Sequence, residues 1–347
     1  RQRLMFFDML VREFGPDPRA IQAAADAYLR TKDLKAFLAL NAAVEPPRQE
    51  LFRRINRAPR GTATLVAMRA TLLDLIPDHP AFRAIDADLR HLLSSWFNRG
   101  FLTLERIDWH SPADVLEKLI RYDTVHEIQS WDDLRRRLAP DRRCFAFFHP
   151  ALPAEPLIFL EVALVRGMAR EIPPLLELNA PVLDPKTANT AIFYSINNTQ
   201  RGLRGLSFGN FLIKQVLFEL SGELPQLRTF ATLSPLPGFA ALLRAAVDGK
   251  DATFTAERVD ALLESARAAL TAAAGVPRAG QAMLALLERG GAGNQALLAE
   301  PLELLALAYL TLLPREHPGF DPVAAFHLSN GARLERINTF ASPAPRT

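Results

Sequence analysis

The sequence predicts an α+β protein, in which an all-α helical bundle domain at residues 1–140 precedes a mixed α/β domain at residues 141–347. Three observations support this division. Apolar residues recur at helical spacing through the first domain, with proline and glycine between the runs. Short β-type runs begin near residue 144. A strand, a glycine-rich loop, a helix and a second strand then follow one another between residues 190 and 238, as in a βαβ unit.

The first 140 residues show the periodicity of packed helices. Leu4, Phe7 and Leu10 would share one face of a helix. Asp17 and Pro18 form a helix start, because aspartate caps helix N-termini and proline fits the first helical position. We expect a helical bundle that serves as a scaffold or as an oligomer interface.

Two short β-type runs, at residues 144–148 and 157–165, open the second domain. Helical patterns return later, and we expect a helical insertion at residues 240–313. Five arginines lie just before the first run: Arg135, Arg136, Arg137, Arg142 and Arg143. A solvated face is the simpler interpretation of this basic run, and pairing with the phosphates of a ligand is the alternative.

The stretch at residues 190–238 organises the second domain. Residues 191–196 are apolar and rich in β-branched and aromatic side chains, which predicts a buried strand. Apolar residues between 212 and 220 recur at helical spacing, and residues 227–233 indicate a second strand. The order of these elements predicts a crossover between two parallel strands.

Three glycines, Gly202, Gly205 and Gly209, lie between the first strand and the helix. Glycine lets the backbone adopt positive φ and approach a ligand closely. Amides at the N-terminus of the following helix lack partners and carry the positive end of its dipole, an arrangement that binds phosphate. The spacing is not G-x-G-x-x-G, and no G-K-[ST] closes the loop, so nucleotide-binding motifs match poorly. A turn that only packs the helix on the sheet is the alternative interpretation.

A β-hairpin is predicted near the end of the chain. Strand-like runs at residues 323–328 and 332–337 flank Asn330-Gly331, and both of these residues tolerate positive φ. His327 would then lie on a strand just before a tight turn. A histidine held there can act as a general acid or base near neutral pH, whereas a structural histidine is the alternative.

Ser234 ends the second strand of the βαβ stretch. Ligands gather at the carboxyl ends of strands in open α/β sheets, which makes this hydroxyl a candidate site residue. Pro235 restricts the backbone of Ser234. Ser-Pro is also a common turn opener, so a role in the turn alone is the alternative.

Composition limits the function further. Of 347 residues, 49% are hydrophobic and 23% are charged, and a net charge of +3 is too small to indicate nucleic acid. The most apolar stretch, residues 296–313, contains two glutamates and a proline, so no membrane span is expected. Cys144 is the single cysteine, and no residues have zinc-ligand spacing, so neither a disulfide nor a metal is expected. We expect a cytoplasmic location in a bacterial cell.

Residues 204–213 read RGLSFGNFLI. This run resembles the R-G-x-[GA]-x-G-x-x-L-[LI] pyrophosphate loop of the GNAT acyltransferase superfamily, with serine at a position where Gly or Ala is usual. The resemblance implies that backbone amides in this run hold the pyrophosphate of coenzyme A. The residues concerned are Arg204, Gly205, Leu206, Ser207, Phe208, Gly209 and Asn210.

Several longer segments resemble the malonyl-CoA decarboxylase family. They cover most of the chain from residue 106 on and include RIDW (106–109), VHEI (125–128), WDDL (131–134), DRRC (141–144), the runs 191–196 and 200–214, LSPLPGF (233–239) and FHLSNGA (326–332). The resemblance implies a helical domain joined to a GNAT-like mixed α/β catalytic domain. It also implies that Ser234 and His327 form the catalytic pair.

The chain departs from the family pattern at two places. Some members carry a glutamate where this chain has Ser207, so a role for a carboxylate in the loop is not expected here. The family pattern also continues beyond Asn338 with a tyrosine-bearing segment, whereas this chain ends in ASPAPRT. We therefore expect part of the C-terminal end of the site to be missing or rearranged.

The resemblance implies decarboxylation of malonyl-CoA to acetyl-CoA and CO2 through an enolate that His327 protonates. No metal or redox cofactor is implied, because the thioester is the electron sink and coenzyme A is part of the substrate. The expected partners are malonyl-CoA and acetyl-CoA, together with further copies of the chain joined through the helical domain, and neither nucleic acid nor a membrane. Two other functions stay open: a GNAT-type acyl-CoA-dependent acyltransferase, and a non-catalytic acyl-CoA-binding protein.

Overall fold

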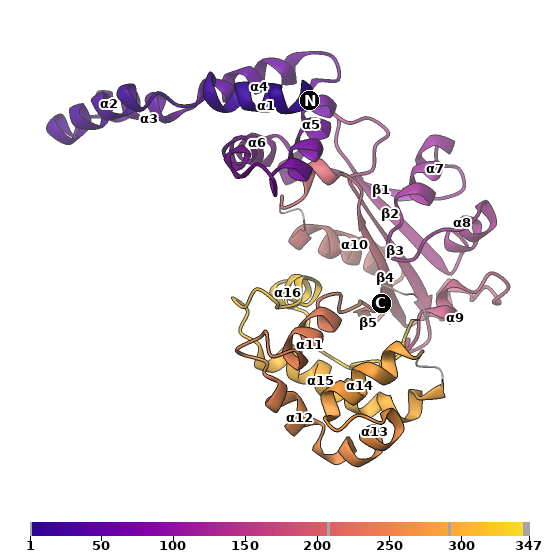
Figure 1. Cartoon of the computed structure of the whole chain (residues 1–347). Helices are drawn as coiled ribbons and strands as arrows, with labels where there is room; N and C mark the ends of the chain where they lie inside the picture. The colour runs from indigo at the N-terminus through magenta and orange to yellow at the C-terminus, as the bar shows by residue number, and fades with distance from the viewer. Residues whose placement is uncertain (1, 207–208, 291–292, 343–347) are drawn as a thin grey trace. The chain divides into compact units, whose positions relative to one another are not determined.

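The structure is a computed structural model that describes residues 2–206, 209–290 and 293–342. It confirms the predicted fold class, because a helical N-terminal region is followed by a region with a mixed sheet (Figure 1). The chain divides into two compact units that are each built from several segments. Unit 1 comprises Arg1–Thr124, Cys144–Leu160 and Ile196–Phe208, and unit 2 comprises Val125–Arg143, Glu161–Ser195 and Gly209–Thr347. The boundary near residue 140 stays a prediction.

The N-terminal region is built from α-helices with short 3₁₀ helices between them. These are α1 (Gln2–Arg12), α2 (Pro18–Thr31), α3 (Leu34–Val44), α4 (Pro47–Arg57), α5 (Gly61–Leu75), η1 (Pro80–Phe82), α6 (Arg83–Trp96), η2 (Arg99–Phe101), α7 (Ala113–Tyr122) and α8 (Trp131–Arg137). The predicted start of α2 is confirmed. The Asp17 side chain accepts a hydrogen bond from the Arg19 amide, and Pro18 occupies the first helical position.

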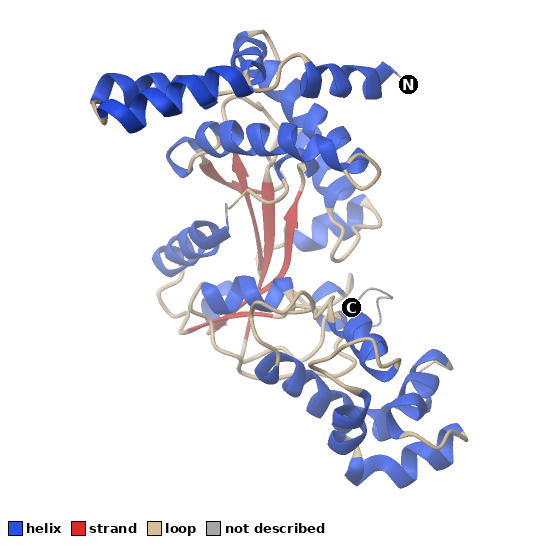
Figure 2. Ribbon diagram, turned by 60° about the vertical axis from the view of Figure 1, so that its left-hand side comes forward, coloured by secondary structure: helices blue, strands red, loops and turns tan. Residues whose placement is uncertain are grey.

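The strands form one five-stranded sheet, whose order follows the chain. Figure 2 draws the strands in red among the helices. They are β1 (Thr103–Ile107), β2 (Arg142–Phe148), β3 (Ile158–Val165), β4 (Thr190–Asn198) and β5 (Thr229–Thr232). β1 and β2 are antiparallel, with Thr103 opposite Phe148. β4 and β5 are parallel, with Thr190 opposite Thr229. β1 lies in the stretch predicted to be all-helical, so that prediction is wrong for these residues.

The predicted βαβ unit is confirmed. β4 is followed by the short helix η4 (Arg201–Leu203), then by α10 (Gly209–Glu223) and β5. The parallel pairing of β4 with β5 requires such a crossover. Leu212, Val216 and Leu220 recur at every fourth position of α10 and are buried, which fixes the face that the helix turns to the core.

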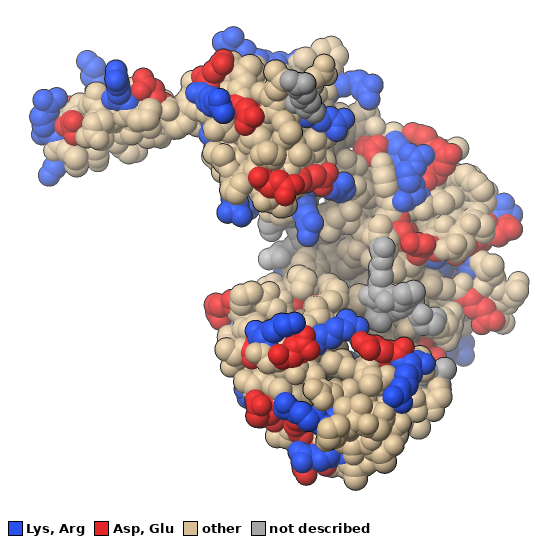
Figure 3. All heavy atoms as spheres, in the orientation of Figure 1, with Lys and Arg blue, Asp and Glu red and all other residues tan. Residues whose placement is uncertain are grey.

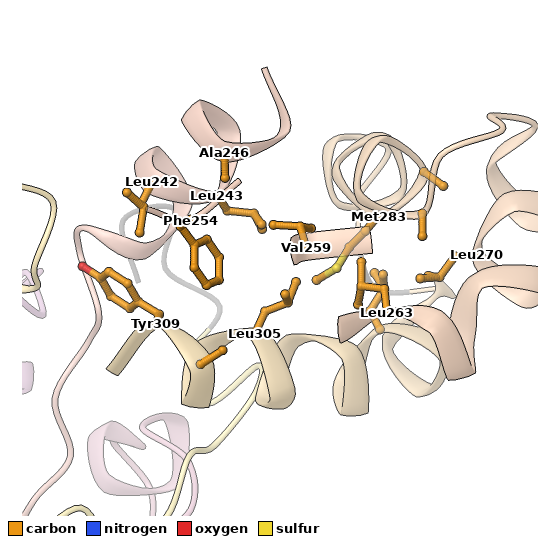
Figure 4. Packing of buried hydrophobic residues seen from close by; sticks show 14 of the residues in the cluster. Leu242, Leu243, Ala246, Phe254, Val259, Leu263, Leu270, Met283, Leu305 and Tyr309 are labelled. Carbon is orange, nitrogen blue, oxygen red and sulfur yellow. The ribbon is translucent and has the colours of Figure 1, made fainter. Parts of the chain in front are cut away.

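Further helices come after β5 along the chain, and the predicted helical stretch at residues 240–313 is present. The remaining elements are α9 (Pro173–Leu176), η3 (Pro185–Thr187), α11 (Phe239–Val247), α12 (Ala256–Leu262), η5 (Glu264–Ala266), α13 (Arg267–Ala274), α14 (Ala279–Glu288), α15 (Gln295–Leu312) and α16 (Pro322–Ser329). Helices α11 to α15 share a hydrophobic cluster that includes Phe254, Met283 and Leu305 (Figure 4).

α15 is, among the residues that the structure describes, the helix long and apolar enough to cross a membrane by length and composition alone. Its Leu298, Leu305 and Tyr309 are buried in the same cluster. Leu304, Leu307 and Leu312 of the same helix are exposed, so only part of its apolar surface packs within unit 2. On the face shown in Figure 3, acidic and basic side chains are interspersed over these helices.

The prediction that the basic run forms a solvated face is wrong for most of its members. Four of the five arginines are buried: Arg136, Arg137, Arg142 and Arg143. Arg137 donates to Glu161 at 3.0 Å and to Asp133 at 2.9 Å, and Arg136 donates to Asp141 at 2.7 Å. A buried guanidinium is tolerated only where carboxylates and carbonyls compensate the loss of water. The run therefore belongs to an internal ion-pair network of unit 2.

Candidate functional site

The two candidate reactive side chains of the sequence lie next to each other in unit 2. The Oγ atom of Ser234 is 3.0 Å from Nε2 of His327. Ser234 is exposed, whereas His327 is half-buried. The strand pairing continues up to the serine, because the Leu233 amide donates to the Phe193 carbonyl at 3.0 Å. A hydroxyl and an imidazole at this distance can exchange a proton and can present it to a bound molecule.

His327 lies on a helix, so the prediction that it lies on a strand is wrong. α16 begins at Pro322, and the Asp321 side chain accepts hydrogen bonds from the amides of Val323 and Ala324 at 2.9 and 3.0 Å. Aspartate followed by proline is the same helix start that the sequence shows at the beginning of α2. The Asp321-Pro322 pair is therefore the signal in the sequence that identifies a helix at this position.

The Asn330-Gly331 dipeptide ends α16 and does not form a hairpin turn. The Ala332 amide donates to the His327 carbonyl at 3.1 Å, and the Gly331 amide donates to the Leu328 carbonyl at 3.2 Å. Gly331 has a φ of 87°. These are the two bonds and the left-handed residue of a Schellman motif, which closes helix C-termini. Residues 332–337 form no strand, so the predicted second half of the hairpin is also wrong.

The environment of His327 favours its neutral form. Burial lowers the pKa of the imidazole below its ordinary value, because desolvation disfavours the charged state. Near neutral pH the ring is therefore uncharged, with one ring nitrogen protonated and the other able to accept a hydrogen bond. Such a ring can share a single hydrogen with the Ser234 hydroxyl in either direction.

The glycine loop is described as far as Leu206. Gly205 has a φ of 80° and is exposed, and no heavy atom of the described residues, its chain neighbours aside, lies within 4 Å of the position of a Cβ. Gly209 and Asn210 open α10. Ser207 and Phe208, which belong to the same predicted loop, lie outside the described residues. A positive φ at Gly205 is the conformation for which the motif needs glycine.

α5 supports this loop within unit 1 through Arg69, a residue that no motif in the sequence distinguishes. The buried Arg69 donates from Nη1 to the carbonyls of Gly202 and Arg204, at 2.7 and 2.9 Å, and its Nε pairs with Asp86 at 2.7 Å. A Cβ on Gly202 would lie 1.9 Å from the carbonyl oxygen of Val66. Glycine is thus required there by close approach of two backbones.

Within the described ranges, no three histidine, cysteine, aspartate or glutamate side chains are grouped so that they could hold a metal ion. Cys144 is buried in β2. The prediction that no cofactor is needed stays a prediction.

Two protein-family models match the chain. One is described as the malonyl-CoA decarboxylase C-terminal domain and matches residues 100–347. The other is described as the malonyl-CoA decarboxylase N-terminal domain and matches residues 14–97. Together they leave few residues unmatched.

Curated relatives and solved structures agree with these models. The mitochondrial malonyl-CoA decarboxylase of Mus musculus is 36% identical over 365 residues, which are 98% of this chain and 72% of the mouse protein. The protein of the same name from Anser anser anser is 33% identical over 369 residues, which are 99% of this chain and 71% of the goose protein.

Solved structures of malonyl-CoA decarboxylases cover nearly the whole chain. The malonyl-CoA decarboxylase from Rhodopseudomonas palustris is 47% identical, with a TM-score of 0.86, and the alignment covers 99% of this chain and 80% of that one. The malonyl-CoA decarboxylase from Cupriavidus metallidurans is 37% identical, with a TM-score of 0.71, over 99% of this chain and 88% of that one.

We expect the imidazole of His327 to titrate below the ordinary histidine pKa of about 6.5. Because folding favours the neutral ring, the stability that it contributes is present above about pH 6.5 and is lost as the pH falls through the lowered pKa. Heteronuclear NMR of the ring resonances measures this pKa, and His327→Asn assigns the signal. A midpoint at or above 6.5 contradicts the expectation.

Proposed function

This chain belongs to the malonyl-CoA decarboxylase family, and we propose that it converts malonyl-CoA to acetyl-CoA and CO2. Membership confirms the predicted family and its enzyme class, the carboxy-lyases. The observation that best supports the proposed chemistry is the 3.0 Å contact between Ser234 Oγ and His327 Nε2. The hydroxyl and the imidazole lie beyond the end of β5, where ligands of open α/β sheets collect, and this position supports their proposed role as an acid–base pair.

The reaction breaks the bond between C2 of the malonyl group and its carboxylate carbon. The electron pair of that bond moves into the thioester as an enolate, and CO2 leaves. A proton then adds to C2, which gives the acetyl group. Hydrogen-bond donors held at the thioester oxygen stabilise the enolate, by about 10²–10³ in rate for each donor.

His327 is proposed to supply the proton that reaches C2, either directly or through the Ser234 hydroxyl. Ser234 is proposed to hydrogen-bond the substrate or to orient His327. The proton is replaced from water after the product has formed. A positioned acid of this kind contributes about 10²–10⁴ in rate. The thioester accepts the electrons of the broken bond, so the proposal includes no cofactor.

The glycine loop is proposed to bind the pyrophosphate of coenzyme A. The amides would come from Arg204, Gly205, Leu206, Ser207, Phe208, Gly209 and Asn210. Support comes from the positive φ of Gly205 and from the start of α10 at Gly209, because the first amides of a helix lack intrahelical partners and its dipole favours an anion.

Incubation with malonyl-CoA, followed by mass spectrometry of the thioester products, tests the proposal. Formation of acetyl-CoA and CO2 without any acceptor supports a decarboxylase. A product that appears only when an amine is added would indicate a GNAT-type acyltransferase. Saturable binding without turnover would indicate a non-catalytic acyl-CoA-binding protein.

We propose a bacterial cytoplasmic location, since the solved relatives are bacterial proteins. The names of the mouse and goose relatives place those proteins in mitochondria. Further copies of this chain are proposed as its protein partner.

The helical hairpin of α2 and α3 is the proposed surface for that association. The two helices contact each other, and neither contains a buried residue. Large apolar side chains are exposed on it: Leu29, Leu34, Phe37, Leu38 and Val44. An exposed apolar surface of this kind is typical of a protein interface.

His327→Asn should lower kcat by about 10²–10⁴, because asparagine keeps a polar side chain but cannot carry the proton. Affinity for coenzyme A should stay unchanged in calorimetry. His110→Asn is the control, since the His110 side chain is almost fully exposed. Normal turnover of His327→Asn would remove the assignment.

Gly205→Val should weaken coenzyme A binding at least about tenfold, because a β-branched residue is strained at positive φ. Gly249→Val is a matched control. Gly249 has a φ of 71° and equally open surroundings, but it lies outside the loop. Unchanged affinity of Gly205→Val in calorimetry refutes the proposed loop function.

Leu34→Asp combined with Phe37→Asp should reduce the mass of the protein in solution, because charges would be buried in the interface between copies. Light scattering coupled to size exclusion measures that mass. Lys35→Asp reverses a charge on a different face of α3 and should leave assembly intact. A wild-type protein that is monomeric, or a double variant of unchanged mass, rules out this surface.

A further inference from the structure

The carboxylate of Asp321 joins the two segments that carry Ser234 and His327. Its side chain is fully buried, with 0% of the residue exposed. One oxygen, Oδ1, accepts from the first amides of α16. The other oxygen, Oδ2, accepts from the amide of Gly238 at 3.0 Å, in the turn that follows Ser234. A single planar group therefore sets the separation of the turn and the helix.

The turn between Ser234 and Gly238 has little freedom of its own. Its sequence is Ser-Pro-Leu-Pro-Gly, and each proline fixes one φ angle. Because the turn is stiff, the position of the Gly238 amide determines the position of Ser234. His327 lies on α16, which is a regular helix from Pro322 to Ser329. The position of its N-cap, Asp321, therefore determines the position of His327.

Tyr309 anchors the same carboxylate to the core of unit 2. Its hydroxyl lies 3.4 Å from Oδ2 of Asp321 and donates to the Gly319 carbonyl at 2.9 Å. The ring packs 5.5 Å from that of Phe239, at one end of the hydrophobic cluster, and the hydroxyl points away from the cluster (Figure 4). The tyrosine thus fixes the carboxylate from a third element, α15.

Gly238 leaves room for this arrangement. A Cβ at that position would lie 2.5 Å from the Tyr309 hydroxyl and 3.4 Å from Oδ2 of Asp321. Its φ is −80°, which any residue can adopt, so space rather than backbone conformation requires the glycine. The close approach lets the amide reach a carboxylate that is shielded from water.

A helix cap alone does not need these features. Asp17 caps α2 with the same Asp-Pro sequence, yet it is exposed. Within the described residues, its side chain accepts a hydrogen bond only from the start of its own helix. Burying a carboxylate is costly unless donors surround it. At Asp321 the donors come from the turn at Gly238 and from the start of α16, and the Tyr309 hydroxyl lies beside them.

We propose that Asp321 is a positioning residue for catalysis, which holds His327 at hydrogen-bond distance from Ser234. This inference rests on the proposed function of that pair. Asp321 does not touch substrate in this account. It acts by keeping the imidazole and the hydroxyl within hydrogen-bond distance of each other. A displacement of about 1 Å between such groups can lower the rate about 10²-fold.

Asp321→Asn separates positioning from capping. The amide oxygen can still cap α16, whereas the NH2 group cannot accept from the Gly238 amide. We expect kcat to fall about 10- to 100-fold with KM nearly unchanged, and the ring nitrogen shifts of His327 to move in NMR spectra. Tyr309→Phe removes the hydroxyl that lies beside Oδ2 and bonds the Gly319 carbonyl, and it should give a smaller loss of the same kind. Asp17→Asn is the control and should leave kcat, KM and these shifts as in wild type.

Wild-type kcat and wild-type His327 shifts in folded Asp321→Asn overturn the proposal. If that variant does not unfold cooperatively, Tyr309→Phe is the variant that tests the proposal. Wild-type kcat and wild-type His327 shifts in Tyr309→Phe then overturn it. His327→Asn, assayed beside them, keeps the two hypotheses apart. An active His327→Asn refutes the function of the pair, whereas an inactive one beside a fully active Asp321→Asn refutes only the positioning role.

Discussion

The parallel pairing of β4 with β5 is the constraint on which the proposed site depends. Parallel neighbours cannot be joined by a tight turn, so the chain leaves β4, crosses over through α10 and returns in β5. This path places the glycine loop directly before the N-terminus of α10. It also leaves Ser234 at the carboxyl end of β5. One backbone constraint thereby creates both the proposed phosphate-binding loop and the position of the hydroxyl.

Elements whose signal is local could be predicted from the sequence. A buried parallel strand is a continuous apolar run, and residues 191–196 fall within β4 for that reason. The helical stretch before α16 was predicted from periodicity alone. β1 was missed because its five residues stand among helices, and the partner that makes them a strand, β2, comes only after α7 and α8.

Signals that fit two structures, or that depend on distant partners, misled the prediction. Asn-Gly suits a two-residue hairpin and a helix C-terminus equally well, because both need a positive φ. Only Asp321-Pro322 upstream distinguishes the two. The pairing of Ser234 with His327 came from family resemblance rather than from spacing. The sequence favours a surface position for the arginine run because Glu161 and Glu223, which pair with Arg137 and Arg143, lie far along the chain.

The end of α16 has a consequence for the chemical ageing of the protein. In flexible chains, asparagine before glycine deamidates readily, because the next amide nitrogen attacks the side-chain carbonyl and closes a succinimide ring. Here the Gly331 amide is bound to the Leu328 carbonyl, and the Asn330 side-chain amide donates to the Phe326 carbonyl at 2.7 Å. Ring closure must therefore wait until this helix end frays, so folding itself protects the vicinity of His327 from acquiring a new negative charge.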